Sequence, residues 1–311
     1  MDAPFLPKYR PAETTRSPWL SSAISLLAYV LVASLLIKDL TVALILILIL
    51  VFHECGHYIA MRYYRYHQTG IFFIPLLGAW VSGSKRTLSQ RESATIILAG
   101  PLPGILVGIL LLLFTRYVAL DGSTTAVLNW SGVALVLLNG FNLLPIYPLD
   151  GGQLLNRVFL NEESWLSKAF VLLSALLMTW MALSLRFYAL LLFPLLLLWR
   201  NRKDKHLSVV EERVAAAGIP TDLDYEQLPD EDYWKIRAIL IDHHPRFASV
   251  DRSRTNYDSK EATVQRTIAS LLDRKLIMDL PLTNKIMLAT LWTAALLVTA
   301  LIALLSTKNL S

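Results

Sequence analysis

The stretch TVALILILILVFHECGH, residues 41 to 57, decides how the rest of this chain is interpreted. Its first twelve residues, through Phe52, include no charged side chain, and the run predicts a membrane-spanning helix from about Leu40 to Tyr63. Two histidines and a glutamate then follow inside the same helix. A carboxylate near the bilayer interior costs about 2.5 to 3.5 kcal/mol. The placement of Glu54 therefore indicates a functional site.

The HECGH sequence at residues 53 to 57 has the spacing of a metal-binding helix. His53 and His57 lie four residues apart, so both imidazoles share one helix face and can bind one zinc ion. Glu54 lies beside them and has the chemistry of a general base. The pattern predicts a zinc site with a carboxylate next to it.

A catalytic zinc site needs a third protein ligand, and the sequence offers two acidic candidates. Asp150 follows two prolines, which interrupt a regular helix, and precedes Gly151 and Gly152, which allow a close turn. Irregular backbone at membrane depth is tolerated where it is buried in protein or lines a wet cavity. We therefore expect Asp150 to be the third ligand. Glu92 is the alternative, because it lies near the start of a later apolar run.

The composition is that of a polytopic membrane protein. The 311 residues are 55% hydrophobic and only 17% charged, with a mean hydropathy of +0.49, whereas about 25% charged residues is usual in soluble proteins. The net charge of +5 does not indicate a nucleic acid partner, because most basic residues lie in short segments beside apolar runs. The single cysteine excludes an internal disulfide.

We expect an all-α polytopic membrane protein with about seven transmembrane helices, a short membrane-associated β-hairpin or sheet and a small soluble domain. The expected domains are a cytoplasmic tail (1–18), a transmembrane core (19–200) with a β-like segment (64–91), a soluble domain (201–284) and a last helix with its tail (285–311). The β-like segment is rich in β-branched and aromatic residues and interrupted by glycines. The apolar run from 164 to 200 is expected to hold two spans, the second short; one tilted helix is the alternative.

Lysine and arginine indicate the orientation. They cluster in the tail, in the segment after the second span and at residues 200 to 205. Basic segments beside spans favour the cytoplasm, and seven alternating spans put all three clusters on that side. The soluble domain and the ends of the helices that carry His53 and Asp150 would then face the cytoplasm.

Together, HECGH at 53–57 and NLLPIYPLDGG at 142–152 resemble the site-2 protease family of intramembrane zinc metalloproteases. The resemblance covers roughly residues 19 to 160. It implies that His53, His57 and Asp150 bind one Zn²⁺ per chain, that Glu54 is the catalytic base, and that Asn142 faces the site. Asn142 has an alternative role, which is a hydrogen bond to a helix backbone.

The resemblance also implies the reaction and its partners. The expected activity is hydrolysis of a peptide bond within or next to a transmembrane segment, in a multi-pass protein of the bacterial cell membrane. The substrate would be another transmembrane protein, for which a membrane-tethered regulator such as an anti-sigma factor is one class. We expect residues 70 to 83 to pair with an extended substrate; a purely structural hairpin is the alternative.

Two other functions compete with this interpretation. One is a membrane-anchored zinc protease that acts on soluble or misfolded proteins, with Glu92 as its third ligand. The other is a non-enzymatic membrane scaffold or transporter, which would be favoured by damaged motifs. The motifs at 53–57 and 142–152 are undamaged.

Overall fold

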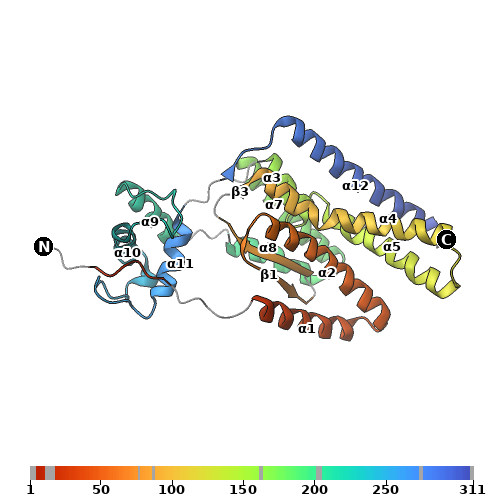
Figure 1. Ribbon diagram of the computed structural model, residues 1–311, viewed down its shortest axis with the longest axis horizontal. Coiled ribbons are helices and arrows are strands. Elements are labelled where there is room, and N and C mark those ends of the chain that lie inside the picture. The colour runs from red at the N-terminus through yellow and green to blue at the C-terminus, as the bar shows by residue number, and fades with distance from the viewer. Residues whose placement is uncertain are drawn as a thin grey trace. The chain divides into compact units, whose positions relative to one another are not determined.

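A computed structural model describes residues 5–10, 18–75, 78–85, 88–160, 164–200, 205–272 and 276–308 (Figure 1). The chain divides into two compact units. The membrane unit comprises Arg16–Leu196 and Ile277–Ser311, and the polar unit comprises Met1–Thr15 and Leu197–Leu276. The two are described separately below.

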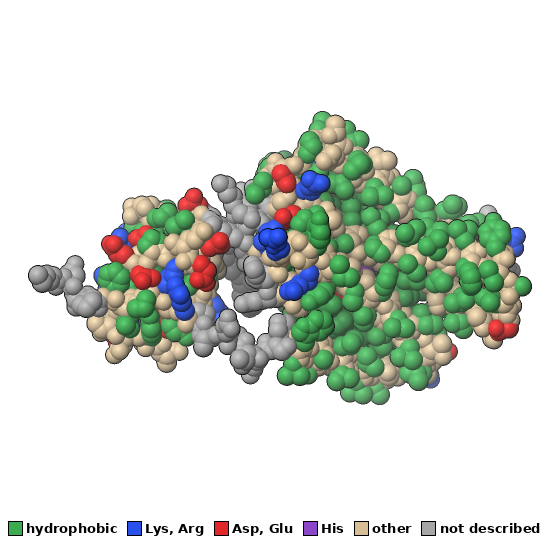
Figure 2. Space-filling view, viewed as in Figure 1, with side chains coloured by type: hydrophobic (Ala, Val, Ile, Leu, Met, Phe, Trp, Pro, Cys, Tyr) green, Lys and Arg blue, Asp and Glu red, His purple; other side chains and the backbone are tan. Residues whose placement is uncertain are grey.

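The membrane unit is built mainly from long apolar helices. Their bounds are α1 (Pro18–Leu36), α2 (Leu40–Tyr63), α3 (Gln90–Ala99), α4 (Pro101–Tyr117), α5 (Gly122–Asn142), α7 (Trp165–Ser184) and α12 (Leu282–Lys308). The helices α3 and α4 form one span that is interrupted at Gly100, where the prolines of PLP follow. Figure 2 shows hydrophobic side chains covering most of the visible face of this unit, as expected for a surface in contact with lipid.

Six helices among the described residues are long and apolar enough to cross a membrane. The expected short span after α7 is instead a 3₁₀ turn, η2 (Tyr188–Leu191), followed by α8 (Leu192–Arg200). The nine residues of α8 rise only about 14 Å at 1.5 Å per residue, which is less than the bilayer core of about 30 Å. The expected sixth span is therefore a short and broken segment.

The expected β-like segment forms an antiparallel hairpin of β1 (His67–Ile74) and β2 (Gly78–Ser84), with Ile71 opposite Val81. The outer edge of β1 faces α1. There the backbone N–H groups of Ile71 and Phe73 donate to the hydroxyls of Ser22 and Ser25, each at 3.2 Å. Hydrogen-bonding direction alternates along such a pair, so the N–H of Val81 points away from β1.

Several shorter elements lie within the membrane unit or at its boundary in the sequence. Two-residue strands β3 (Leu88–Ser89) and β4 (Leu276–Ile277) pair with each other. A short helix, α6 (Asp150–Leu154), continues into a π-helical turn, η1 (Leu155–Phe159). The helices α4, α5 and α12 pack side by side (Figure 1).

The polar unit has its own core around α9 (Lys205–Ala216), α10 (Asp230–His243), the 3₁₀ turn η3 (Pro245–Phe247) and α11 (Glu261–Leu271). The last of these helices, α11, ends at Leu271. Arg237 and Glu261 form a buried ion pair with both N–O distances at 2.8 Å. Burial and the hydrogen bond to Glu261 raise the pKa of the Tyr233 phenol, which therefore stays protonated and donates.

One part of the expected tail belongs to this unit. The described residues 5–10 are packed on the helical part of it, with Leu6 and Tyr9 against its core. The segment that we expected to be a separate tail is therefore held by the residues that follow α8.

Candidate metal centre

The two histidines lie on one face of α2, which the close packing of α3 buries. Gly56 allows this packing, because a Cβ at that position would lie 2.0 Å from the carbonyl oxygen of Ala99. His53 and His57 are 5% and 8% exposed, so both rings lie inside the helix bundle.

Each ring is oriented by an acceptor at its Nδ1 atom. His53 Nδ1 lies 2.8 Å from Asn139 Oδ1, and His57 Nδ1 lies 2.7 Å from the carbonyl oxygen of Ile96. The amide of Asn139 is fixed in turn, because its Nδ2 donates to the carbonyl oxygen of Leu135 at 2.8 Å. In neutral rings the Nδ1 atoms therefore carry the proton, and the Nε2 atoms carry a lone pair.

Asp150 is the first residue of α6 and reaches the histidines at the end of the loop that follows α5. The start of α6 packs closely against the end of α5 at Gly151, where a Cβ would lie 1.9 Å from the carbonyl oxygen of Leu143. Two helices brace the loop: Tyr147 N donates to Ser174 Oγ of α7 at 3.1 Å, and Trp292 Nε1 of α12 donates to Leu143 O at 2.7 Å. The position of Asp150 thus depends on helices that lie after it in the sequence.

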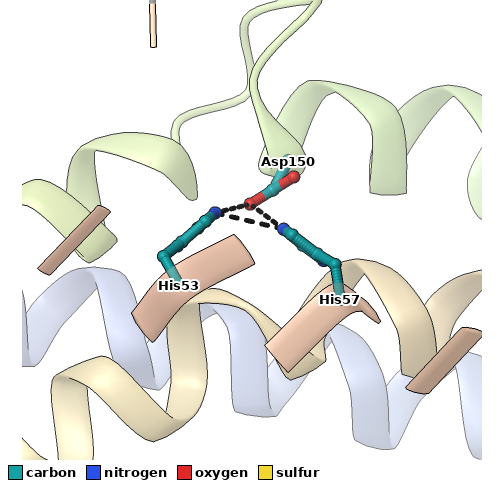
Figure 3. A group of neighbouring side chains, drawn as sticks. All are labelled: His53, His57 and Asp150. Carbon is teal, nitrogen blue, oxygen red and sulfur yellow. Dashed lines mark hydrogen bonds and ion pairs between the residues drawn. The ribbon is translucent and has the colours of Figure 1, made fainter. Parts of the chain in front are cut away.

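Three acceptor atoms converge at the centre of this site (Figure 3). Asp150 Oδ2 lies 3.1 Å from His53 Nε2 and 3.3 Å from His57 Nε2, and the two Nε2 atoms are 3.1 Å apart. Asp150 Oδ2 is buried and accepts no conventional hydrogen bond among the described residues. With both rings neutral, two imidazole lone pairs and a carboxylate oxygen face one another, and a bound cation would bridge them. The identity of these three ligand atoms and their burial fit a zinc ion with three protein ligands.

The other predicted residues have different surroundings. Glu54 is 4% exposed and lies beside His53 on α2. Asn142 is the last residue of α5, and no hydrogen bond joins it to the three converging side chains in the described part of the chain. Glu92, the alternative ligand, instead pairs with Lys85, with both N–O distances at 2.7 Å.

Sequence reasoning missed Asn139 and Trp292. A signal for Asn139 was present, since it is a polar residue inside an apolar span and lies three positions before Asn142, on nearly the same helix face. Trp292 gave no such signal, because a tryptophan in an apolar span is ordinary. Its role depends on the packing of α12 against α5.

Comparison with known proteins gives one family model and two curated relatives. The family model of Peptidase family M50 matches residues 41–122. Zinc metalloprotease MJ0392 of Methanocaldococcus jannaschii is 26% identical over 123 residues, which is 40% of this chain and 35% of the relative. Stage IV sporulation protein FB of Bacillus subtilis is 27% identical over 128 residues, 41% of this chain and 43% of the relative.

Residues 41–122 of this chain thus resemble peptidase family M50, the family of the site-2 proteases. A solved site-2 protease from Methanocaldococcus jannaschii is 23% identical, with a TM-score of 0.42, covering 55% of this chain and 83% of that one. The matched part spans less than half the length of the two curated relatives. The family match includes HECGH and ends before Asp150, so the third ligand rests on the geometry alone.

Proposed function

We propose that this protein is an intramembrane zinc metallopeptidase that cleaves a peptide bond within or next to a transmembrane segment of another protein. The observation that supports this most is the buried convergence of His53, His57 and Asp150, whose facing atoms lie 3.1 to 3.3 Å apart. The six apolar helices support a site enclosed by membrane spans.

The chain's own residues divide the chemistry between them. His53, His57 and Asp150 would hold one Zn²⁺. Bound there, it would lower the pKa of a water molecule and polarise the scissile carbonyl. Glu54 accepts the proton of the attacking water and returns it to the leaving amine. Asn142 is a candidate donor to the oxyanion. Asn139 and the Ile96 carbonyl hold the histidine rings in the orientation that binding requires.

The substrate must be unwound before cleavage, because a helical backbone shields its peptide bonds. We propose that it pairs in extended form with the outer edge of β2. The edge of β1 is a poorer candidate, since hydroxyls of α1 accept hydrogen bonds from its N–H groups. The N–H groups of Val81 and Ala79 point the other way and suit β-strand addition.

We further propose that the site faces the cytoplasm, because the segments rich in Lys and Arg that flank α1, α2 and α8 would share that side. Membrane-tethered regulators such as anti-sigma factors are one class of transmembrane substrate that suits such a site. A bacterial cell membrane stays an expectation, since the relatives include an archaeal and a bacterial protein.

The test uses Glu54→Gln in the purified, detergent-solubilised protein. The amide cannot accept the water proton, so cleavage of a model transmembrane substrate should fall by at least about 10² to 10⁴ fold while zinc stays bound. His53→Ala should lose the zinc, as measured by metal analysis. Glu92→Gln is the matched control and should keep zinc and cleavage. Near-normal turnover of Glu54→Gln would refute the proposal.

A further inference from the structure

An extended stretch of the chain, Leu6-Pro7-Lys8-Tyr9, lies on the helical part of the polar unit and is hydrogen-bonded along its backbone. The N–H of Leu6 donates to the carbonyl oxygen of Arg254 at 3.0 Å. The N–H of Lys8 donates to Asp230 Oδ1 at 3.1 Å. Pro7 has no N–H, so it needs no acceptor.

The carbonyl groups of the same stretch accept hydrogen bonds from three aromatic side chains. Trp234 Nε1 donates to Leu6 O at 2.6 Å, Tyr257 Oη to Pro7 O at 2.5 Å and Tyr225 Oη to Tyr9 O at 2.7 Å. Two of these aromatic rings, those of Trp234 and Tyr257, are stacked at 6.3 Å between centroids. An extended backbone whose N–H and C=O groups are both hydrogen-bonded by the surrounding protein is typical of peptide-binding grooves.

One side chain of the stretch enters a polar pocket. Lys8 is only 5% exposed, and its ammonium donates to the carbonyl oxygens of Glu226 and Leu228 at 2.6 and 2.7 Å. It also lies 5.7 Å from the centre of the Tyr225 ring, within the range of a cation–π contact. Two close carbonyls and an aromatic ring suit a compact ammonium better than the larger planar guanidinium of arginine.

We propose that the polar unit is a lysine-reading peptide-recognition module, and that residues 6–9 are its resident ligand. The aromatic and carbonyl groups of 225–257 form the site, and Leu-Pro-Lys-Tyr is a short linear segment that binds it reversibly. The segment is therefore an intramolecular ligand of the polar unit. A protein with a similar apolar-Pro-Lys-aromatic segment would compete for the same groove.

The alternative is that residues 5–10 are a permanent part of the fold of this unit. The two alternatives differ in whether residues 5–10 can be replaced by a separate peptide of the same sequence. A ligand leaves its groove and is replaced by another copy once it is no longer covalently attached, whereas a permanent element stays or takes the fold with it.

The test uses the full chain with a site for a specific protease inserted between residues 10 and 18. After cleavage, a fluorescent peptide of residues 1–12 is added and its binding is followed by anisotropy. The groove is filled throughout, so the unit never has to fold without the segment. The readout is peptide binding, which is independent of any peptidase activity.

We expect saturable exchange of the labelled peptide. The Lys8→Ala peptide should bind at least tenfold more weakly, because it loses two charge-assisted hydrogen bonds, and Lys8→Arg should also be weaker. The matched Arg10→Ala peptide should bind as the unchanged one does, since Arg10 is exposed. Tyr257→Phe in the protein should weaken binding about two- to tenfold, the effect of one neutral hydrogen bond.

Two results would overturn the proposal. Failure of the cleaved segment to exchange in native buffer would make it a permanent part of the fold. Equal binding of the Lys8→Ala and unchanged peptides would show that the groove does not read lysine.

Discussion

At His53, one hydrogen bond decides which ring nitrogen can bind a metal. Asn139 Oδ1 accepts the Nδ1 proton, so the free lone pair is on Nε2, the atom that faces Asp150. The same holds at His57 through the Ile96 carbonyl. Groups that orient ligands in this way commonly change metal affinity by about 10 to 100 fold when removed.

Replacing Asn139 tests this role. Asn139→Ala should weaken zinc binding by about 10 to 100 fold, because the ring of His53 loses the acceptor that fixes its proton and its orientation. Asn139→Asp keeps an acceptor and should retain most of the affinity. Competition with a chelator of known affinity measures both. Asn142→Ala is the matched control and should leave zinc affinity unchanged; equal affinities of the Ala and Asp variants at 139 would contradict the role.

Among the elements, the β1–β2 hairpin and α12 have the largest effect on the site and on how a substrate approaches it. The register of β1 and β2 determines which backbone groups are open to a substrate, and the serines of α1 occupy those of β1. α12 lies outside the residues matched by the family model, yet its Trp292 satisfies a carbonyl at the C-terminal end of α5. Residues far from the HECGH sequence therefore shape the site and its approach.

A proline in β2 tests the substrate edge. Val81→Pro removes an N–H that points away from β1, so the hairpin keeps its own ladder while a substrate strand loses a donor. We expect slower cleavage of a transmembrane substrate with zinc content unchanged. Trp80→Pro is the comparison, because that N–H faces β1 and its loss should disrupt the hairpin itself. Cleavage by Val81→Pro at the normal rate would exclude this edge.

Trp292→Phe tests the brace on the loop that carries Asp150. The ring can still stack on Phe159, but Leu143 O loses its donor. An unsatisfied buried carbonyl costs about 1 to 3 kcal/mol, so we expect a lower unfolding temperature in detergent together with weaker zinc binding. Trp180→Phe, on an exposed face of α7, is the control and should behave as the unchanged protein. An identical response of the two variants would show that Trp292 of α12 does not stabilise the loop before Asp150.

For the molecule as a whole, the packing of residues 5–10 on the polar unit constrains the topology. Segments packed together lie on one side of the membrane, so an even number of crossings must separate residue 10 from residue 205. The spans α1, α2, α3–α4, α5 and α7 make five. We therefore predict that the apolar segment from η2 to α8 completes a sixth crossing, although α8 alone is shorter than the bilayer core.

Cysteine labelling in intact cells tests this topology. In a Cys55→Ala background, Arg10→Cys and Asn256→Cys should both be protected from an impermeant reagent, because both positions are exposed on the polar unit and should face the cytoplasm. Leu120→Cys, between α4 and α5, should be labelled from outside. If Arg10→Cys and Asn256→Cys respond differently, segment 186–200 does not cross.

From the sequence alone, the membrane class, most spans, and the pairing of HECGH with a later aspartate could be predicted. These are patterns of few residues at fixed spacing: apolar length follows from bilayer thickness, and the i, i+4 histidines follow from the helical repeat. The β-like segment was also predictable, from its composition. The assignment of metal ligands and of Glu54 stays a prediction until metal and activity are measured.

Only the tertiary structure decided which distant segments contact one another. The contact of Asn139 with His53 joins two helices, and that of Trp292 with Leu143 joins residues 149 positions apart. The extent of α8 and the binding of Lys8 by residues 226 and 228 depend in the same way on segments distant in the chain. Local periodicity fixes which residues share a face of one helix. Which faces meet is set by packing, and packing depends on all the elements at once.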